Sequence, residues 1–135
     1  MVGVLVVSHG NLAKAMLECV DMLVGVPEQL GYVGIYPEDE PASFYKRLQE
    51  KASEIDTGEG IVALVDIFGG TPNNSVARLS LERNIRIITG MNLPMLLAVA
   101  TERKDTTSQA ELVDLLLGTV PDEIKEFILE SEQDA

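Results

Sequence analysis

The stretch from residue 61 to residue 72, Ile-Val-Ala-Leu-Val-Asp-Ile-Phe-Gly-Gly-Thr-Pro, contains a strand, a loop and the start of a helix. Its first five residues are apolar and three of them are β-branched, which predicts a strand buried on both faces over residues 61–65. Thr71 is a suitable N-cap and Pro72 suits the first helical position, so we expect a helix to about Glu82. A buried strand leading directly into a helix is the repeating unit of α/β folds.

The same unit recurs along the chain. Short apolar runs predict strands at residues 2–7, 31–36 and 85–89, and helical spacing or capping signals predict helices at 12–23, 44–55, 94–101 and 108–117. This alternation predicts an α/β fold: an open, doubly wound, mainly parallel sheet of four strands flanked by helices, in a single domain over residues 1–135. Residues 124–128 fit either a helical face or a short edge strand.

The composition is strongly acidic, with 22 Asp and Glu residues against 10 Lys and Arg residues and a formal net charge of −12. This charge argues against a nucleic-acid partner and against docking on anionic lipid, and it suits neutral or basic protein partners. The apolar run at residues 2–7 is too short for a signal or membrane segment and no basic stretch precedes it, so we expect a cytoplasmic protein.

Cys19 is the only cysteine, which excludes an internal disulfide and a CxxC centre. It falls inside the helical pattern of residues 12–23, so we expect it to be a small core residue. One histidine and one cysteine cannot build a nitrogen and sulfur metal site within the chain, and no GxxxxGK[ST] phosphate loop is present. We therefore expect no metal and no cofactor.

Three loops follow predicted strands and are expected at one edge of the sheet. They are residues 8–10 (Ser-His-Gly), residues 66–72, and residues 90–94 (Gly-Met-Asn-Leu-Pro). In open α/β sheets, ligands bind beyond the carboxyl ends of the strands, so these loops define the expected site.

His9 is the only histidine, and neither packing nor solubility explains an imidazole between a buried strand and a helix N-terminus. Asp66 ends another buried strand, where it either caps the following turn or accepts a hydrogen bond from Nδ1–H of His9. The second alternative would fix the tautomer and leave the Nε2 lone pair free as a nucleophile.

The segment from Phe68 to Pro72 offers backbone N–H groups beside a helix N-terminus with little side-chain obstruction, which suits a bound anion. Gly-Gly before Thr-Pro is equally compatible with a plain turn and helix cap. A nucleophilic imidazole, an orienting carboxylate and an anion cradle together suit reversible phosphorylation of a histidine, in which an N–P bond forms at Nε2.

Three segments resemble the mannose-family IIA domains of the bacterial phosphoenolpyruvate-dependent sugar phosphotransferase system. They are residues 6–13 (Val-Val-Ser-His-Gly-Asn-Leu-Ala), 65–74 (Val-Asp-Ile-Phe-Gly-Gly-Thr-Pro-Asn-Asn) and 90–96 (Gly-Met-Asn-Leu-Pro-Met-Leu). The resemblance implies that His9 takes a phosphoryl group from the carrier protein HPr and passes it to a histidine of a IIB protein. It implies that Asp66 positions His9. The implied phosphate-binding residues are Phe68, Gly69, Gly70 and Thr71, and the implied pocket rim is Ser8, Gly10, Pro72, Asn73, Asn92 and Pro94.

The resemblance also implies a homodimer in which the C-terminal segment is exchanged as a fifth edge strand. The sequence ends after the similarity, so we expect IIB to be a separate protein and any membrane association to be indirect, through a permease complex. Two related alternatives are the phosphocarrier domain of a dihydroxyacetone kinase system and a regulatory module controlled by His9 phosphorylation. A small tetrapyrrole chelatase shares the strand and His-Gly turn, but such a site usually enlists further ligands and this chain has no second histidine.

Overall fold

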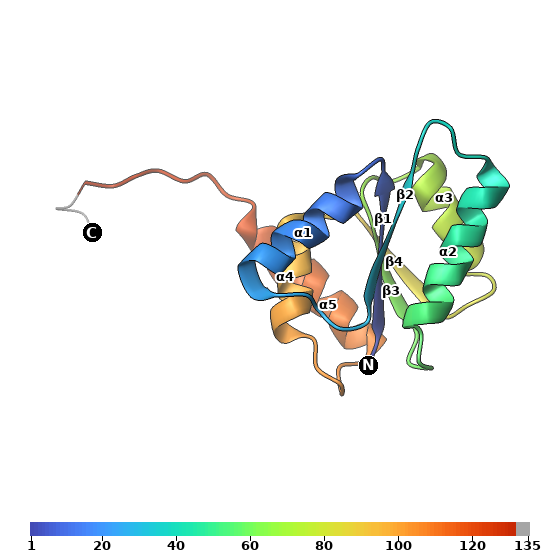
Figure 1. Cartoon of the computed structure of the whole chain (residues 1–135). Helices are drawn as coiled ribbons and strands as arrows, with labels where there is room; N and C mark the ends of the chain where they lie inside the picture. Colours follow the sequence, from blue (N-terminus) through green and yellow to red (C-terminus); the bar gives the residue numbers. More distant parts are fainter. Residues whose placement is uncertain (132–135) are drawn as a thin grey trace.

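The fold is that of a computed structural model, which describes residues 1–131 of the chain. Within these residues, parallel strands form one four-stranded sheet in the order β2-β1-β3-β4, between two layers of helices (Figure 1). The strands are β1 (Gly3–His9), β2 (Leu30–Ile35), β3 (Ile61–Val65) and β4 (Ile85–Thr89). The predicted doubly wound α/β fold is confirmed.

Successive residues of the buried strands point to opposite faces of the sheet, where they pack into two separate hydrophobic cores. Val4 and Val6 of β1 face a core shared with α1 (Leu12–Val24), α4 (Leu93–Glu102) and α5 (Gln109–Thr119). Leu5 and Val7 face the other core, which includes residues of α2 (Pro41–Ile55) and α3 (Gly70–Leu79). Burial on both faces explains why these strands are continuous apolar runs without polar alternation.

The strand order places a topological switch point between β1 and β3. The chain passes outward from β1 to β2 and then returns to place β3 on the other side of β1. The helices after β1 and β3 therefore lie on opposite faces of the sheet, which opens a crevice at the carboxyl ends of these two strands.

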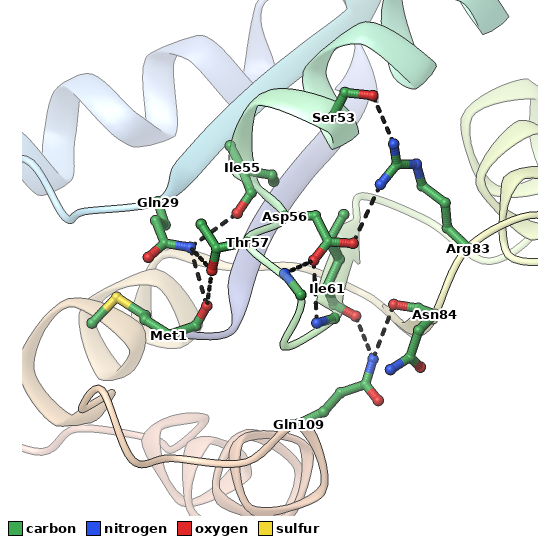
Figure 2. Close-up of polar contacts among 12 residues, drawn as sticks. Met1, Gln29, Ser53, Ile55, Asp56, Thr57, Ile61, Arg83, Asn84 and Gln109 are labelled. Atoms are coloured by element: carbon green, nitrogen blue, oxygen red, sulfur yellow. Dashed lines mark hydrogen bonds and ion pairs between the residues drawn. The ribbon is translucent and has the colours of Figure 1, made fainter.

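Polar side chains hold the opposite, amino edge of the sheet together (Figure 2). The Gln29 amide donates to the carbonyls of Met1 and Ile55, each at 3.0 Å. The Gln109 amide donates to the Ile61 carbonyl at 2.8 Å, and Arg83 pairs with Asp56 at 3.3 Å. These contacts join the segments that enter the strands, so this edge of the sheet is braced independently of the carboxyl edge.

The helix after β3 begins earlier than predicted. Gly69, with φ 80°, occupies the N-cap position that we expected for Thr71, and α3 runs from Gly70 to Leu79 instead of ending near Glu82. Two consecutive glycines with positive φ let the chain turn into the helix before Thr71 is reached. The predicted capping box of α5 is confirmed, because Ser108 and Glu111 cap each other's backbone N–H groups.

The prediction that Cys19 is a core residue of α1 is wrong, because Cys19 is exposed. The buried residues of this helix are Ala13 and Val20, and Met16 and Leu17 pack partly against the same core. This helix carries more apolar residues than one face can bury, so helical spacing alone did not determine which of them point inward.

After α5 and the short 3-10 helix η1 (Val120–Glu123), residues 124–131 form neither a helix nor a strand and extend away from the two helical layers (Figure 1). The helical alternative for residues 124–128 is therefore wrong. The exchanged strand stays a prediction, because it concerns a second copy of the chain. No helix within residues 1–131 is long and apolar enough to cross a membrane.

Candidate functional site

His9 and Asp66 meet at the switch point. His9 is the last residue of β1, two residues beyond the point where β1 and β3 stop pairing, and Asp66 directly follows β3. The backbone N–H of His9 donates to Oδ2 of Asp66 at 2.9 Å, and Nδ1 of the His9 ring lies 2.8 Å from the same oxygen. The predicted contact between the two side chains is present.

The protonation of this pair follows from the environment of Asp66, whose side chain is 8% exposed. Burial alone would raise the pKa of the Asp66 carboxyl. The hydrogen bonds donated by the backbone and ring of His9 and by the Ile67 N–H outweigh burial, so this pKa lies below its ordinary value. An ionised carboxylate can only accept, so Nδ1 carries the proton and the neutral ring keeps a lone pair on Nε2.

The glycine loop leaves space in front of that lone pair. A Cβ built on Gly70 would lie 3.6 Å from Cε1 and 3.7 Å from Nε2 of His9. The backbone at the start of α3 thus comes close to the reactive edge of the imidazole while the position of a side chain stays open. A helix N-terminus beside this space favours a bound anion.

A hollow of about 420 Å³ adjoins His9. It is lined by His9, Gly10 and Thr71, which we predicted in the site, and by Ile35, Tyr36 and Pro37, which we did not. The carboxyl-end rule could have indicated the last three, because they end or directly follow β2 at the same edge of the sheet.

Three of the predicted rim residues have contacts within the fold. Ser8 is fully buried and its hydroxyl accepts a hydrogen bond from the Ala13 N–H at 2.8 Å, which caps α1. Asn92 accepts from the Met95 N–H at 2.9 Å and caps α4. Pro94 lines a separate groove between α4 and the segment after α5.

The remaining predicted residues lie on and around α3. Phe68 directs its side chain to solvent, with 86% exposed, while Pro72 is buried against the core and Asn73 contacts Asn74. None of the hydrogen bonds within residues 1–131 joins these side chains to His9. That Phe68, Gly69, Gly70 and Thr71 bind phosphate stays a prediction.

The site has no acidic, thiol or imidazole cluster suited to a metal. In the part of the chain that the structure describes, no three His, Cys, Asp or Glu side chains are grouped so that they could hold an ion.

The chain is similar to known proteins of one family. A family model described as the PTS system fructose IIA component (EIIA-man) matches residues 3–117. The mannose-specific EIIAB component of Escherichia coli K12 is 29% identical over 125 residues, covering 92% of this chain and 39% of that protein. The sorbose-specific EIIA component of Lacticaseibacillus casei is 32% identical over 117 residues, covering 84% of this chain and 82% of that protein. The crystal structure of a phosphotransferase system component EIIA from Streptococcus agalactiae aligns with a TM-score of 0.85 at 25% identity, covering 94% of this chain and 98% of that one.

The fold and the site define a small doubly wound α/β domain with one imidazole, oriented by an ionised carboxylate, at its switch point. The chain belongs to the EIIA-man family, the IIA components of the mannose, fructose and sorbose branch of the bacterial phosphotransferase system.

Proposed function

We propose that His9 accepts a phosphoryl group from the phosphohistidine of HPr and passes it to a histidine of a IIB component during sugar uptake. One observation carries this proposal: Asp66 holds Nδ1 of His9 at 2.8 Å and leaves Nε2 as the available nucleophile beside the Gly70 backbone. The family membership supports the choice of partners, because IIA components are parts of a phosphotransferase system.

The proposed transfer is a direct exchange between two imidazoles. The lone pair of His9 Nε2 attacks phosphorus, the donor's N–P bond breaks, and its electron pair returns to the donor ring. Positive charge develops on the His9 ring, where the Asp66 carboxylate stabilises it, in the way that an aspartate stabilises the imidazolium of a catalytic triad. The phosphoryl oxygens face the N-terminus of α3, where backbone N–H groups suit their negative charge.

Residues 1–135 form one phosphoryl-carrier domain in this proposal, which needs no metal or cofactor and acts in the cytoplasm. The chain spans 39% of the length of the EIIAB relatives that it matches. The aligned part of those relatives therefore gives no direct support for a IIB acceptor, which is part of the proposal. We assign no sugar to the chain, because a phosphoryl carrier has no need to contact it.

We also propose a homodimer in which the C-terminal segment pairs with the second copy. Ile124, Phe127, Ile128 and Leu129 are all at least 70% exposed on a segment that extends away from the body of the molecule (Figure 1). Within residues 1–131, β4 pairs with β3 on one side only. An apolar extended segment and a sheet edge with free backbone groups suit each other.

The test is phosphorylation of the purified chain with phosphoenolpyruvate, enzyme I and HPr. We expect acid-labile label on the native chain and none on His9→Ala, whose circular dichroism should match the native spectrum because the imidazole is half exposed. Loss of the ring hydrogen bond to Asp66 should lower the melting temperature of this variant without unfolding it at the assay temperature. Label that survives in His9→Ala, or a native chain that takes no label from phospho-HPr, would contradict the proposal.

A further inference from the structure

The wall of the hollow beside His9 has no role in the transfer described above. Ile35, Tyr36 and Pro37 form this wall where the chain leaves β2. These side chains are mostly carbon, and a water molecule beside them finds few hydrogen-bonding partners. The Tyr36 hydroxyl is the polar exception among the three.

The Tyr36 hydroxyl is already engaged. It donates to Oδ1 of Asn11 at 2.5 Å, across 25 positions of sequence. Asn11 occupies the N-cap of α1, but its side chain makes no capping hydrogen bond there, because the Ser8 hydroxyl accepts from the first turn instead. The Asn11 carboxamide is therefore free to hold Tyr36 against the start of α1.

The turn that carries Tyr36 and Pro37 is fixed from its other end. The Asp39 N–H donates to the Tyr36 carbonyl at 3.0 Å, and the Tyr36 N–H donates back to the Asp39 carboxylate at 2.8 Å. Pro37 occupies the second position of this turn, where its fixed φ is favoured. Arg47 of α2 donates to the same carboxylate at 2.5 Å and to the Gly34 carbonyl at 3.0 Å.

A close backbone approach joins this wall to the turn after His9. The Gly10 N–H donates to the Ile35 carbonyl at 2.7 Å, and a Cβ at position 34 would overlap the Gly10 carbonyl oxygen. The wall therefore cannot shift away from His9 without breaking contacts on β2, α1 and α2.

We propose that the Tyr36–Pro37 wall shields phosphorylated His9 from water, and that Tyr36 is a positioning residue held in place by Asn11. This inference rests on the proposed function, because it concerns the His9 phosphoryl group. The reaction that it opposes is hydrolysis: a water oxygen bonds to phosphorus, the N–P bond breaks, and its electron pair returns to Nε2, which restores neutral His9 with its proton on Nδ1. Inorganic phosphate leaves and takes up or releases the protons of the water molecule. A fixed, carbon-rich wall excludes water from one side of that group, so the phosphoryl group persists until a protein acceptor arrives.

The experiment measures the lifetime of phospho-His9 without any protein partner. The native chain is phosphorylated with potassium phosphoramidate, a small chemical donor, the reagent is removed, and phosphohistidine is followed by phosphorus NMR at neutral pH. Failure of labelling by HPr would then count against the proposed function alone.

We expect Tyr36→Phe and Asn11→Ala to shorten the half-life by a similar factor, about two- to tenfold, as expected for loss of one hydrogen bond. The double variant should behave like either single one, because both remove the same bond. Tyr36→Ala should shorten the half-life further. The matched control is Tyr32→Ala on the same strand, since Tyr32 is exposed and is absent from the lining of the hollow beside His9. Tyr32 lies in the neighbouring groove, which Tyr36 and Arg47 also line, so the control reports any indirect effect of removing a tyrosine ring from that side of the wall.

Three results would overturn the inference: a native half-life in Tyr36→Ala, an equal loss in Tyr32→Ala, or no phosphorylation of the folded native chain by phosphoramidate. Strictly additive effects of Tyr36→Phe and Asn11→Ala would remove the positioning role of Asn11. A merely structural role for Tyr36 would lower the melting temperature without changing the half-life at 25 °C.

Discussion

At the scale of single residues, one carboxylate oxygen organises the site. Oδ2 of Asp66 accepts hydrogen bonds from both the backbone and the ring of His9, while the other oxygen accepts from Ile67. The same charge therefore fixes the end of β1, the loop after β3 and the tautomer of the imidazole. Its removal should affect both stability and chemistry.

The Asp66→Asn variant tests the contribution of this charge to stability. The pKa of Asp66 is lower in the folded chain than its ordinary value, so the ionised form stabilises the fold above about pH 4, the ordinary carboxyl pKa. That stability is lost as pH falls through the lower pKa of the folded state. We expect the free energy of unfolding of Asp66→Asn at pH 7 to be about 1–3 kcal/mol lower than that of the native chain, because hydrogen bonds to a charged group are lost.

The measurement is urea unfolding of the native chain and of Asp66→Asn at pH 7 and at pH 3. The difference between their free energies of unfolding should be smaller at pH 3. At that pH the Asp66 carboxyl of the native sequence is increasingly protonated, first in the unfolded state and then in the folded state. An equal or larger difference at pH 3 would contradict the assignment. Comparing the two chains at each pH cancels the titration of the other acidic residues.

The position of His9 and Asp66 could be predicted from sequence because it depends on topology alone: both follow buried parallel strands. The Tyr36–Asn11 hydrogen bond could not, since a side-chain contact across 25 positions follows no periodicity. The resemblance implies a rim position for Ser8, yet adjacent residues of a strand point to opposite sides, and Ser8 is buried with its hydroxyl bonded to the first turn of α1.

At the scale of elements, the amino edge of the sheet depends on one buried arginine. Arg103, which directly follows α4, donates to the backbone carbonyls of Val2 and Gln29 at 2.8 and 3.3 Å, and to that of Glu28. Burial lowers the pKa of its guanidinium, and the nearby Glu28 carboxylate opposes this shift. An arginine nevertheless stays charged at neutral pH, so these are charge-assisted bonds.

We expect Arg103→Met to lower the free energy of unfolding by about 2–4 kcal/mol, because three carbonyls lose their charged donor. Arg103→Lys should recover only part of this loss, since an ammonium lacks the planar fork. Arg86→Met, at an exposed position of β4, is the matched control and should stay within about 0.5 kcal/mol of the native chain. A native-like melting curve for Arg103→Met would show that the carbonyls find other partners.

Element types were predicted better than element faces and ends. The strands could be predicted because burial on both sides leaves an unbroken apolar run. The face of α1 could not, since its apolar residues surround more of the helix than the core covers, and Cys19 is therefore exposed. The start of α3 depends on positive φ at Gly69 and Gly70. The sequence prediction placed the start at Thr71-Pro72 instead, because these two residue types are common at helix N-termini.

At the scale of the whole molecule, the apolar segment at residues 124–129 stays exposed in a single copy of the chain. We expect the native chain to sediment as a dimer at micromolar concentration. Replacing both Phe127 and Ile128 by Glu should yield monomers, because charged side chains cannot be buried against a partner at low cost.

Analytical ultracentrifugation measures this outcome, with Lys125→Gln and Glu126→Gln together as the control on the same segment. A native chain that stays monomeric, or a glutamate variant that stays dimeric, would contradict the proposed exchange. Phosphorylation by phosphoramidate should remain possible in the monomer, because His9 and Asp66 come from one chain.

The half-exposed imidazole of His9 stands at the end of a strand whose packing does not depend on it. A copy that lacks this ring should keep its fold and still bind the proposed phosphoryl donor and acceptor. Under the proposed function, such a copy expressed in excess beside native copies would occupy both partners without transferring phosphate and would act as a dominant inhibitor of the proposed uptake.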